Sequence, residues 1–361
     1  MHRPHGAAAF LLVLALAVLL SGCATKHTVA PPATSQRTWI GTYETPSGPQ
    51  AFVLDLVVTG SSVRGQVAMD PASAGLVRVA GTLVGDTLRL GRDPAANANA
   101  TGFEATCHVA ADGHLAGPYA LSVGPSGSLD GHALQRVALA TDLVVDLPFD
   151  VSGLATGGGF LWLATSGAYV RMTPSGTIAD TIRVLDRPDL YWVSPQLTWD
   201  GSKMWGYLPG TIMVPNGHVD YSDLKAFTAA GRTADSIRVW HRTGGLAFDG
   251  LYLWSLRDDR PRVYKLGPTG APLDSIALEA PDATRLAFDG TRFWTTGWNL
   301  VRLYVADYSG HTLGIADLPG TEGGEGWPAG VAIDGSTIWF ALYARGHSTL
   351  YKLHVVGTLP V

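Results

Sequence analysis

A short motif recurs through the last three-fifths of the chain, and it limits the possible folds more than any other feature. Each copy has a short apolar segment, then Asp-Gly, and then a Trp five residues after the Asp. The copies are Asp200-Gly201 with Trp205, Asp249-Gly250 with Trp254, Asp289-Gly290 with Trp294 and Asp334-Gly335 with Trp339. An earlier copy has Gly157-Gly158 before Trp162. The five Trp residues lie 43, 49, 40 and 45 positions apart, which is a period typical of β-propeller blades.

Residues 245–278 show what one copy contains. Four short segments of strand character, Leu246–Phe248, Leu251–Ser255, Arg262–Leu266 and Asp274–Leu278, are separated by turn residues. Gly accepts a positive φ and Asp caps its own turn, so Asp-Gly predicts a tight turn. Four strands in about 35 residues are the unit of a propeller blade.

The two ends of the repeat region predict how the ring closes. The last copy stops soon after its third strand, whereas residues 142–147, before the first copy, have the pattern of a fourth strand. If this strand completes the last blade, the ring has no exposed strand edge. We therefore predict an all-β chain whose residues 137–361 form a five-bladed propeller closed by strand 142–147. Residues 206–223 are an insertion in the second copy, predicted to be a surface loop.

The N-terminal residues have the pattern of an export signal. A positive start and an apolar run from Ala7 to Leu20 precede Leu20-Ser21-Gly22-Cys23. The run is too short for a comfortable transmembrane helix, and the four residues resemble the bacterial lipobox. This resemblance implies a signal peptide at residues 1–23, cleavage before Cys23 and lipidation of that residue. The expected location is the bacterial cell envelope, anchored in the outer membrane, with residues 24–37 as a flexible tether.

Residues 38–136 predict a separate small β-domain without the Trp repeat. Eight short alternating segments fit a meandering barrel or a sandwich. These segments are Thr38–Glu44, Ala51–Thr59, Ser62–Ala68, Leu76–Leu83, Thr87–Leu90, Gly102–Val109, His114–Leu121 and Gly127–Ala133.

Several residue groups could carry chemistry, but each has a simpler interpretation. The repeated Asp residues stand one per blade, so they favour turns over a calcium site, which needs converging oxygens. Cys107, His108 and His114 provide too few ligands for a typical zinc site, and strand alternation separates the first two. The chain contains no Gly-x-Ser-x-Gly, His-Glu-x-x-His, P-loop or Rossmann motif. We therefore expect no metal and no cofactor. A net charge of −5 gives no basic excess for binding nucleic acid.

The loops at the predicted channel mouth are rich in aromatic and charged residues. Exposed Trp beside Arg and Asp is suited to sugar or peptide recognition through stacking and hydrogen bonds, although such side chains also pack loops onto a propeller. The candidate ligand-binding residues are Tyr191, Trp192, His241, Arg257, Asp258, Arg260, Trp298, Asn299, Glu325, Trp327, Tyr343 and Arg345.

The repeat as a whole, Leu-Ala-Phe-Asp-Gly-x-x-x-Trp followed by Val-Tyr-Lys-Leu, Gly and Asp-Ser-Ile, resembles two bacterial propeller groups. One is the five-bladed glutamine cyclotransferase family, and the other comprises the seven-bladed virginiamycin lyase and NHL-type propellers. The resemblance spans residues 149–353. The cyclotransferase opening motif Phe-Thr-Gln-Gly-Leu is matched only in part by Phe149–Leu154, which lacks the Gln. No catalytic residue is therefore transferred from the family.

The expected function is non-catalytic binding of a glycan, a peptide or a protein partner at the loop face, with the membrane reached through Cys23. One alternative is an envelope enzyme at the channel mouth, such as an aminoacyl cyclotransferase or a polysaccharide lyase or hydrolase. Converging carboxylates with raised pKa values would favour that enzyme. A second alternative is a structural subunit of an envelope complex, which a broad exposed apolar patch would favour.

Overall fold

The structure is a computed structural model and describes residues 33–69, 76–96, 101–122, 124–183, 196–214, 217–228, 231–257, 259–321, 326–344 and 346–359. Residues 34–361 form one compact unit. All secondary-structure elements of the described residues are β-strands, which confirms the all-β prediction. No helix in these ranges is long and apolar enough to cross a membrane. Cys23, the predicted signal peptide at 1–23 and tether residues 24–32 lie outside the described residues.

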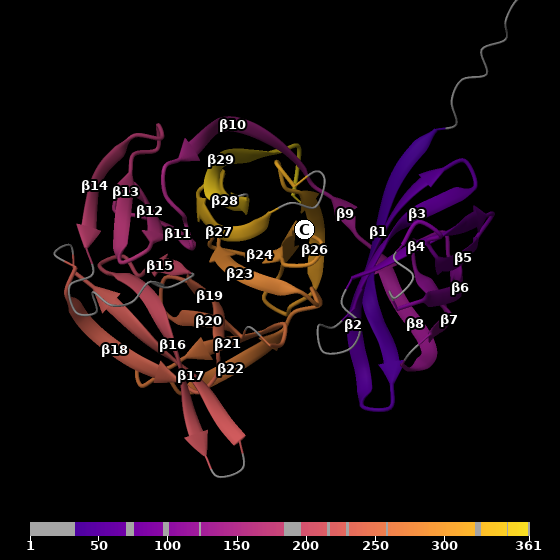
Figure 1. Cartoon of the computed structure of the whole chain (residues 1–361), viewed down its shortest axis with the longest axis horizontal. Helices are drawn as coiled ribbons and strands as arrows, with labels where there is room; N and C mark the ends of the chain where they lie inside the picture. Colours follow the sequence, from indigo (N-terminus) through magenta and orange to yellow (C-terminus); the bar gives the residue numbers. More distant parts are fainter. Residues whose placement is uncertain are drawn as a thin grey trace, which may run out of the picture. The chain divides into compact units, whose positions relative to one another are not determined.

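The N-terminal strands form a closed eight-stranded barrel, which decides between the barrel and sandwich predictions (Figure 1). β1 closes the barrel by pairing with β8, with Trp39 opposite Ala133 and Tyr43 opposite Leu129. The interior is filled by large side chains, including Trp39, Tyr43, Phe52 and Phe103. The strands are β1 (Thr34–Thr45), β2 (Gly48–Thr59), β3 (Ser62–Met69), β4 (Leu76–Val84), β5 (Thr87–Arg92), β6 (Phe103–Val109), β7 (Leu115–Leu121) and β8 (Ser126–Ala133).

The barrel differs from the prediction at its start. β1 begins at Thr34 and pairs with β2 from that residue, so residues 34–37 belong to the barrel and not to the tether. The long β2 provides the backbone partners that hold these residues in a strand. Cys107 faces the core, where burial raises the pKa of its thiol to about 11. His108, the next residue on the strand, is exposed and lies beside Asp86.

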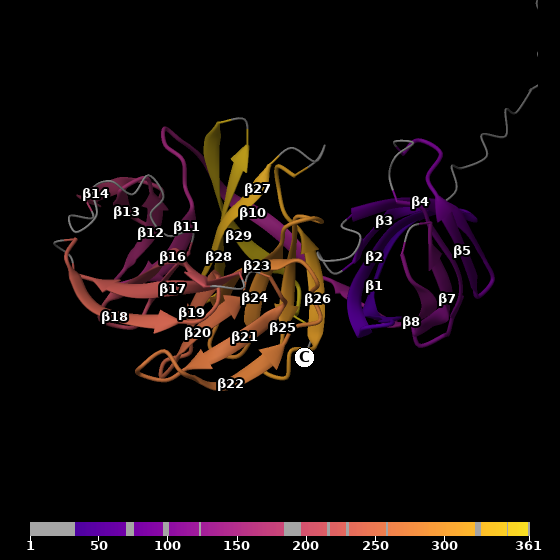
Figure 2. The same cartoon turned by 60° about the horizontal axis from the view of Figure 1, so that its bottom comes forward.

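The C-terminal strands form the five four-stranded blades of a propeller, as predicted. In Figures 1 and 2 the blades surround a common centre. The first four blades are β11 (Gly153–Gly157), β12 (Phe160–Thr165), β13 (Ala168–Met172) and β14 (Ile178–Arg183); β15 (Leu197–Trp199), β16 (Met204–Val214), β17 (Gly217–Phe227) and β18 (Thr233–Val239); β19 (Thr243–Phe248), β20 (Leu253–Arg257), β21 (Arg262–Leu266) and β22 (Pro272–Ala277); and β23 (Ala283–Phe288), β24 (Phe293–Gly297), β25 (Arg302–Ala306) and β26 (Thr312–Asp317).

The fifth blade joins the two ends of the propeller sequence. It consists of β27 (Trp327–Asp334), β28 (Thr337–Ala344), β29 (His347–Val356) and β10 (Ala138–Leu147). Residues 142–147 lie in β10, which pairs antiparallel with β29. Just before it, β9 (Gln135–Arg136) pairs with β26 as a fifth strand of the fourth blade, so the propeller sheets begin before the predicted boundary at 137.

The first strand of each blade faces the ring axis. β11, β15, β19, β23 and β27 contact one another in turn, and β27 contacts β11. The channel between them is a cavity of about 90 Å³, lined largely by apolar residues of all five strands. Close packing of the inner strands leaves room for a larger ligand only beyond their ends.

The repeated Asp and Trp residues form a hydrogen-bonded latch within each of three blades. The indole Nε1 of Trp254 donates to Asp249 Oδ2 at 2.8 Å, while Asp249 Oδ1 accepts the amides of Leu251 and Tyr252 at 2.8 and 2.7 Å. The same indole bond joins Trp205 to Asp200 and Trp294 to Asp289, each at 2.7 Å. Burial raises the pKa of each carboxyl, but these donors outweigh it and hold the pKa below its usual value.

The first and fifth copies depart from this arrangement. In the first, Trp162 Nε1 donates to the backbone carbonyl of Gly157 at 2.9 Å, which explains why Gly can replace Asp. In the fifth, Asp334 is the exposed last residue of β27, opposite Thr337 in a two-residue hairpin. The five-residue spacing therefore covers three structural variants of one turn.

The predicted surface loop at residues 206–223 is instead an extension of the β16–β17 hairpin. The two strands pair continuously from Met204↔Phe227 to Val214↔Gly217. The extension projects from the second blade in Figure 1. Its end carries exposed apolar side chains, namely Ile212, Met213, Val214 and Val219, with Met213 78% exposed.

We expect Asp249→Ala to lower the free energy of unfolding by about 2 kcal/mol, because the indole and two amides lose a charged acceptor. Chemical denaturation of the purified protein measures this change. Asp334→Ala is the matched control, since its exposed carboxyl should cost less than about 0.5 kcal/mol. If the two substitutions lowered the free energy of unfolding equally, the hydrogen bonds of Asp249 would not contribute the expected stability.

Candidate functional site

Three of the predicted ligand-binding aromatic residues form one stack at the end of blades four and five. The Trp298 and Trp327 rings lie 6.1 Å apart with a 9° angle between their planes, and Trp327 and Tyr343 lie 5.7 Å apart at 11°. Trp298 follows β24, Trp327 begins β27, and Tyr343 is its register partner on β28. Both Trp side chains are 46% exposed. The result is a stack of three nearly parallel rings in which both Trp side chains stay partly open to solvent.

Asp282 holds the segment that carries Trp298. Its Oδ2 accepts the amides of Asn299 and Leu300 at 2.8 and 3.1 Å, and its Oδ1 accepts the Tyr304 hydroxyl at 3.2 Å. Its own carbonyl accepts the amide of Trp298. Asp282 is only 3% exposed, and burial raises its pKa against the effect of these donors. Asp282 therefore acts first as a positioning residue.

Backbone geometry shows how tightly this segment is held. A Cβ at Gly297 would lie 2.7 Å from Asp282 Oδ1, so any side chain there would push the carboxylate away. Val301 has a φ of 48°, and it is the one non-glycine residue with a positive φ in the described part of the chain. Such a conformation costs free energy and persists where surrounding contacts enforce it.

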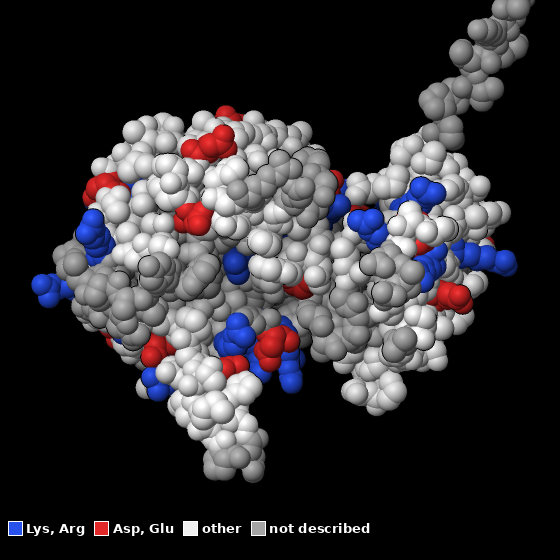
Figure 3. Space-filling model, viewed as in Figure 1, with Lys and Arg blue, Asp and Glu red and all other residues white. Residues whose placement is uncertain are grey.

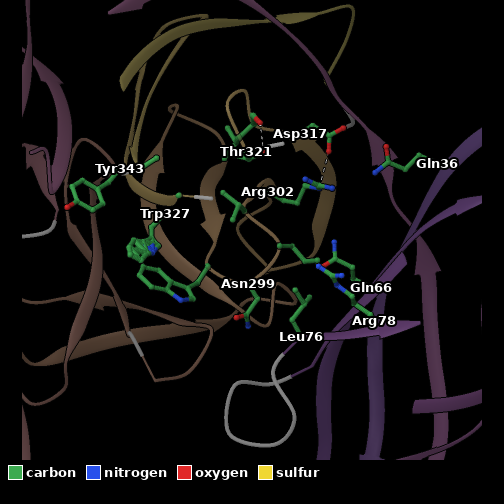
Figure 4. A pocket seen from close by; sticks show the side chains of 16 residues that line it. Gln36, Gln66, Leu76, Arg78, Asn299, Arg302, Asp317, Thr321, Trp327 and Tyr343 are labelled. Atoms are coloured by element: carbon green, nitrogen blue, oxygen red, sulfur yellow. Dashed lines mark hydrogen bonds and ion pairs between the residues drawn. The ribbon is translucent and has the colours of Figure 1, made fainter. Parts of the chain in front are cut away.

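Trp298, at one end of the stack, lines two pockets. The channel-mouth pocket, of about 410 Å³, is lined by Trp298 and Asn299 together with Tyr207, Arg242, Asp259, Arg260, Asp282 and Arg285. The barrel-side pocket, of about 1250 Å³, is lined by Trp298, Trp327 and Tyr343 from the propeller and by Gln36, Gln66, Leu76 and Arg78 from the barrel. Figure 4 shows Trp327 and Tyr343 on one side of this pocket and Gln66 and Arg78 on the other.

Two arginines and two aspartates form a charged network at the edge of the barrel-side pocket. Arg302 lies 2.9 Å from Asp55 on β2 and 3.0 Å from Asp317 on β26. Arg136 contacts the same two carboxylates. Asp55 is buried and also accepts the Thr38 hydroxyl at 2.8 Å. Each charge in this network faces an opposite one, so the network joins the barrel to blade four.

The channel-mouth pocket has a different charge balance. Arg285 lies at the start of β23, where it donates to the carbonyls of Ala329 and Gly244 at 3.1 and 3.4 Å. Asp259 forms a two-bonded ion pair with Arg257; burial raises its pKa, but the pair holds it below the usual value. Figure 3 shows cationic and anionic side chains side by side near the base of the β16–β17 hairpin.

Two predicted residues lie away from the stack. His241 is 6% exposed; its Nε2 is 2.9 Å from the Ser255 hydroxyl, and its ring packs 4.9 Å from that of Tyr264. The prediction placed it on an exposed rim, but in the connection between β18 and β19 its side chain is buried, whereas that of Trp240 is 63% exposed. Arg257 lines the same small groove as His241.

The remaining predicted residues divide into two groups. Arg260 and Asn299 line the channel-mouth pocket beside Trp298. Tyr191, Trp192, Asp258, Glu325 and Arg345 lie outside the described residues.

Asp282 and Arg285 were missed from the sequence, although Arg285 left a signal. Aligned on the inner strands, Arg285 occupies the position of Gly153, Gly245 and Gly330. A Cβ at Gly245 would meet Leu286 at 2.6 Å, which explains Gly at that position. Blades two and four carry Gln196 and Arg285 at the equivalent position, and Arg285 is the charged one of these two exceptions.

Comparisons with solved structures find propeller proteins at low identity. Glutaminyl cyclase of Myxococcus xanthus is 12% identical and matches 62% of this chain and 100% of its own, with a TM-score of 0.47. A PQQ-bound aldose sugar dehydrogenase of Streptomyces coelicolor is 12% identical over 61% of this chain and 99% of its own, with a TM-score of 0.37. The soluble aldose sugar dehydrogenase of Escherichia coli is 9% identical over 60% and 99%, with a TM-score of 0.39.

No family model matches the sequence, and no curated protein matches it. The assignment of the fold rests on the sheet topology, and the site must be interpreted from its own residues.

The buried His241 predicts a loss of stability in acid. Burial, and then the charge of Arg257, lower its pKa from 6.5 to about 4, against the opposing charge of Asp259. The unfolded chain therefore binds more protons between about pH 6.5 and 4, and the stability that neutral His241 confers at pH 7 is lost as the pH falls through this window. The loss at pH 4 should be about 3 kcal/mol.

Denaturation of His241→Gln across this pH range tests the prediction, because the variant should lose that part of the slope. His132→Gln, at an exposed barrel position, is the control and should keep the slope. An unchanged slope in His241→Gln would rule out this origin of the pH dependence.

Proposed function

We propose that the protein is a non-catalytic glycan-binding protein of the bacterial cell envelope, and that the stack of Trp298, Trp327 and Tyr343 receives the glycan. The observation that carries this proposal is the exposure of the stack. The side chains of Trp298 and Trp327 are each 46% exposed, although the buried carboxylate of Asp282 holds the segment that carries Trp298. An exposed aromatic ring at the end of such a stack is suited to the apolar face of a sugar ring.

The surroundings of the stack support a sugar ligand. Asn299 and Arg260 on the channel-mouth side, and Gln66 and Arg78 on the barrel side, are polar side chains at hydroxyl-binding positions around an aromatic surface. Binding pockets commonly combine apolar walls with a few such polar groups. The barrel-side pocket of about 1250 Å³ has room for more than one sugar unit.

An enzyme at the channel mouth is a second candidate, because Asp282 lines that pocket and has a raised pKa. Raised carboxyl pKa values are typical of general acids. The other carboxylate in the lining, Asp259, has a lowered pKa and is paired with Arg257. Asp282 itself accepts two amides and a hydroxyl, which explains its burial without catalysis. The arrangement therefore favours binding over turnover.

A structural subunit is the third candidate. The apolar end of the β16–β17 hairpin, with Met213 78% exposed, is the feature that favours a protein contact. It lies in blade two, whereas the aromatic stack is built by blades four and five, so the two roles are compatible.

Attachment to the envelope rests on the lipobox-like Leu20-Ser21-Gly22-Cys23. We propose that Cys23 carries lipid at the outer membrane and that the following residues connect it to the barrel. The second cysteine, Cys107, is buried in the barrel core, so its substitution is a control for the substitution of Cys23.

Trp298→Ala and Trp327→Ala should each lower the affinity for a bound glycan by at least about tenfold, because each removes a central aromatic contact. A glycan array identifies ligands, and titration calorimetry measures the affinities. Trp240→Ala is the matched control, because Trp240 is 63% exposed and lines neither pocket that contains the stack. The proposal fails if the array shows no ligand or if all three variants bind equally.

Expression of the full chain in bacteria with a labelled fatty acid tests the anchor. The wild-type protein and Cys107→Ser should carry the label and fractionate with membranes, whereas Cys23→Ser should lack the label. Label on Cys23→Ser, or a wild-type protein without label, would contradict lipidation at this residue.

A further inference from the structure

The projecting part of the β16–β17 hairpin is a two-stranded ribbon that extends beyond its sheet (Figure 1). β15 pairs with β16 only as far as Gly206, and β18 pairs with β17 only from Ser222 onward. The outer edges of residues 210–214 and 217–221 therefore face no other strand of the described residues. A two-stranded ribbon is only marginally stable in water, and a free strand edge is a template for pairing with another chain.

One face of this ribbon is apolar. The register places Ile212 opposite Val219 and Val214 opposite Gly217, and alternate residues of a strand share a face. The side chains of Ile212, Val214 and Val219 are 39%, 40% and 39% exposed, respectively. Neighbouring side chains in a wider sheet would cover part of this apolar surface.

The two edges of the ribbon differ in their chemistry. The β16 edge has Pro209 at its base, and proline has no N–H to donate to an added strand. The β17 edge from Gly217 to Tyr221 contains neither proline nor lysine, the residues that commonly protect a strand edge. The β17 edge is therefore the one better suited to pairing.

The sequence of the β17 edge is complementary to itself. Backbone groups of alternate residues point to the same edge, so two copies can pair antiparallel only with the twofold axis at a residue. With the axis at Val219, His218 of each copy lies opposite Asp220 of the other copy, and the two Val219 side chains are neighbours. An axis at His218 or at Asp220 would put two imidazoles or two carboxylates opposite each other, which is less favourable.

His218 and Asp220 already lie on one face of the strand within a single chain. His218 Nε2 lies 3.7 Å from Asp220 Oδ2, and Asp220 Oδ1 accepts the Thr211 hydroxyl at 2.8 Å. Pairing of two copies about Val219 would bring two imidazoles and two carboxylates together on this face, each imidazole opposite a carboxylate. The charges of the edge therefore match those of a second copy.

We propose that the protein forms a twofold-symmetric dimer in which the β17 edges of two copies pair antiparallel about Val219. The two ribbons then form one four-stranded sheet, in which Ile212 and Val219 of both copies make a continuous apolar row. Because the paired edge is short, the dimer belongs to the weak, reversible class of interfaces. The inference concerns blade two and does not depend on glycan binding by the aromatic stack.

Cysteine cross-linking of the full chain in bacterial cells tests the register. Opposite Cα atoms of an antiparallel pair lie about 4.5 to 5.5 Å apart, which is within the span of a disulfide. Val219→Cys should therefore give a dimer on a non-reducing gel that reduction removes. Met213→Cys is the control, because it is more exposed, 78% against 39%, but lies on the outer strand. Its two thiols would be three strand spacings, about 14 Å, apart, and the wild-type chain gives the background.

Charge exchange tests the same contact in the purified, detergent-solubilised chain. His218→Asp and Asp220→His each put like side chains opposite each other at both ends of the paired edge. Each substitution should raise the dissociation constant of the dimer, measured by sedimentation velocity, at least about threefold. The double variant that exchanges the two residues should restore the wild-type constant, a result that a merely misfolded hairpin would not give.

The dimer is overturned if Val219→Cys cross-links no more than Met213→Cys, or if the wild-type chain sediments as a monomer at every concentration. It is also overturned if the exchanged double variant dimerises no better than the single variants. Binding of a monomeric chain to phosphatidylcholine vesicles, lost in Met213→Asp, would assign the hairpin to a lipid surface instead. None of these results changes the effect of Trp298→Ala on glycan affinity, so the two proposals fail separately.

Discussion

The hydrogen bond from a tryptophan indole to the aspartate five residues earlier is the interaction on which the propeller depends. It closes the turn between the first two strands of a blade, fixes the indole within the inter-blade core and satisfies a buried donor at once. Blades two, three and four use the same bond, and blade one replaces the carboxylate by a backbone carbonyl. The repeat in the sequence thus reflects one hydrogen bond in three blades and a variant of the same turn in the other two.

The candidate site uses buried polar groups for a different purpose. The carboxylate of Asp282 is buried, and it accepts hydrogen bonds from two amides and the Tyr304 hydroxyl in place of water. These bonds hold the segment from Trp298 to Val301 in its conformation. The charged network of Asp55, Arg136, Arg302 and Asp317 similarly joins the barrel to blade four beside an apolar cluster that contains Ile40 and Val53. Buried ion pairs contribute little net stability, but unpaired ones are costly. These ion pairs therefore favour one arrangement of the barrel and blade four, and both walls of the barrel-side pocket depend on that arrangement.

Local patterns in the sequence predicted most of the fold, because the bonds involved are local. The Asp-to-Trp spacing indicated the blades, and the pattern at 142–147 indicated a strand in need of a partner. Alternation could not distinguish a barrel from a sandwich, since both bury one face of each strand. It also misplaced the tether boundary, because residues 34–37 become a strand only through pairing with β2.

The site was less predictable, since its contacts link distant parts of the chain. The exposed aromatic residues were found from composition, but Asp55 and Arg302 are 247 positions apart and no local pattern connects them. Arg285 could have been found by aligning the repeats, because the position is Gly in three copies, Gln196 in blade two and a cation only in blade four. His241 was placed on the surface because its neighbours Trp240 and Arg242 are there, whereas its ring is buried against Ser255 and Tyr264, which are distant in the sequence.

The pairing of β10 with β29 also sets the order in which this protein can fold. The barrel strands are neighbours in sequence and can assemble once residue 133 is available. β10 follows directly, yet its partner begins at His347, more than 200 residues later. Contacts of such sequence separation form slowly, because a long chain must be ordered first. During synthesis β10 therefore has no β29 to pair with until the last strand has been made. The ring is completed when β29 pairs with β10.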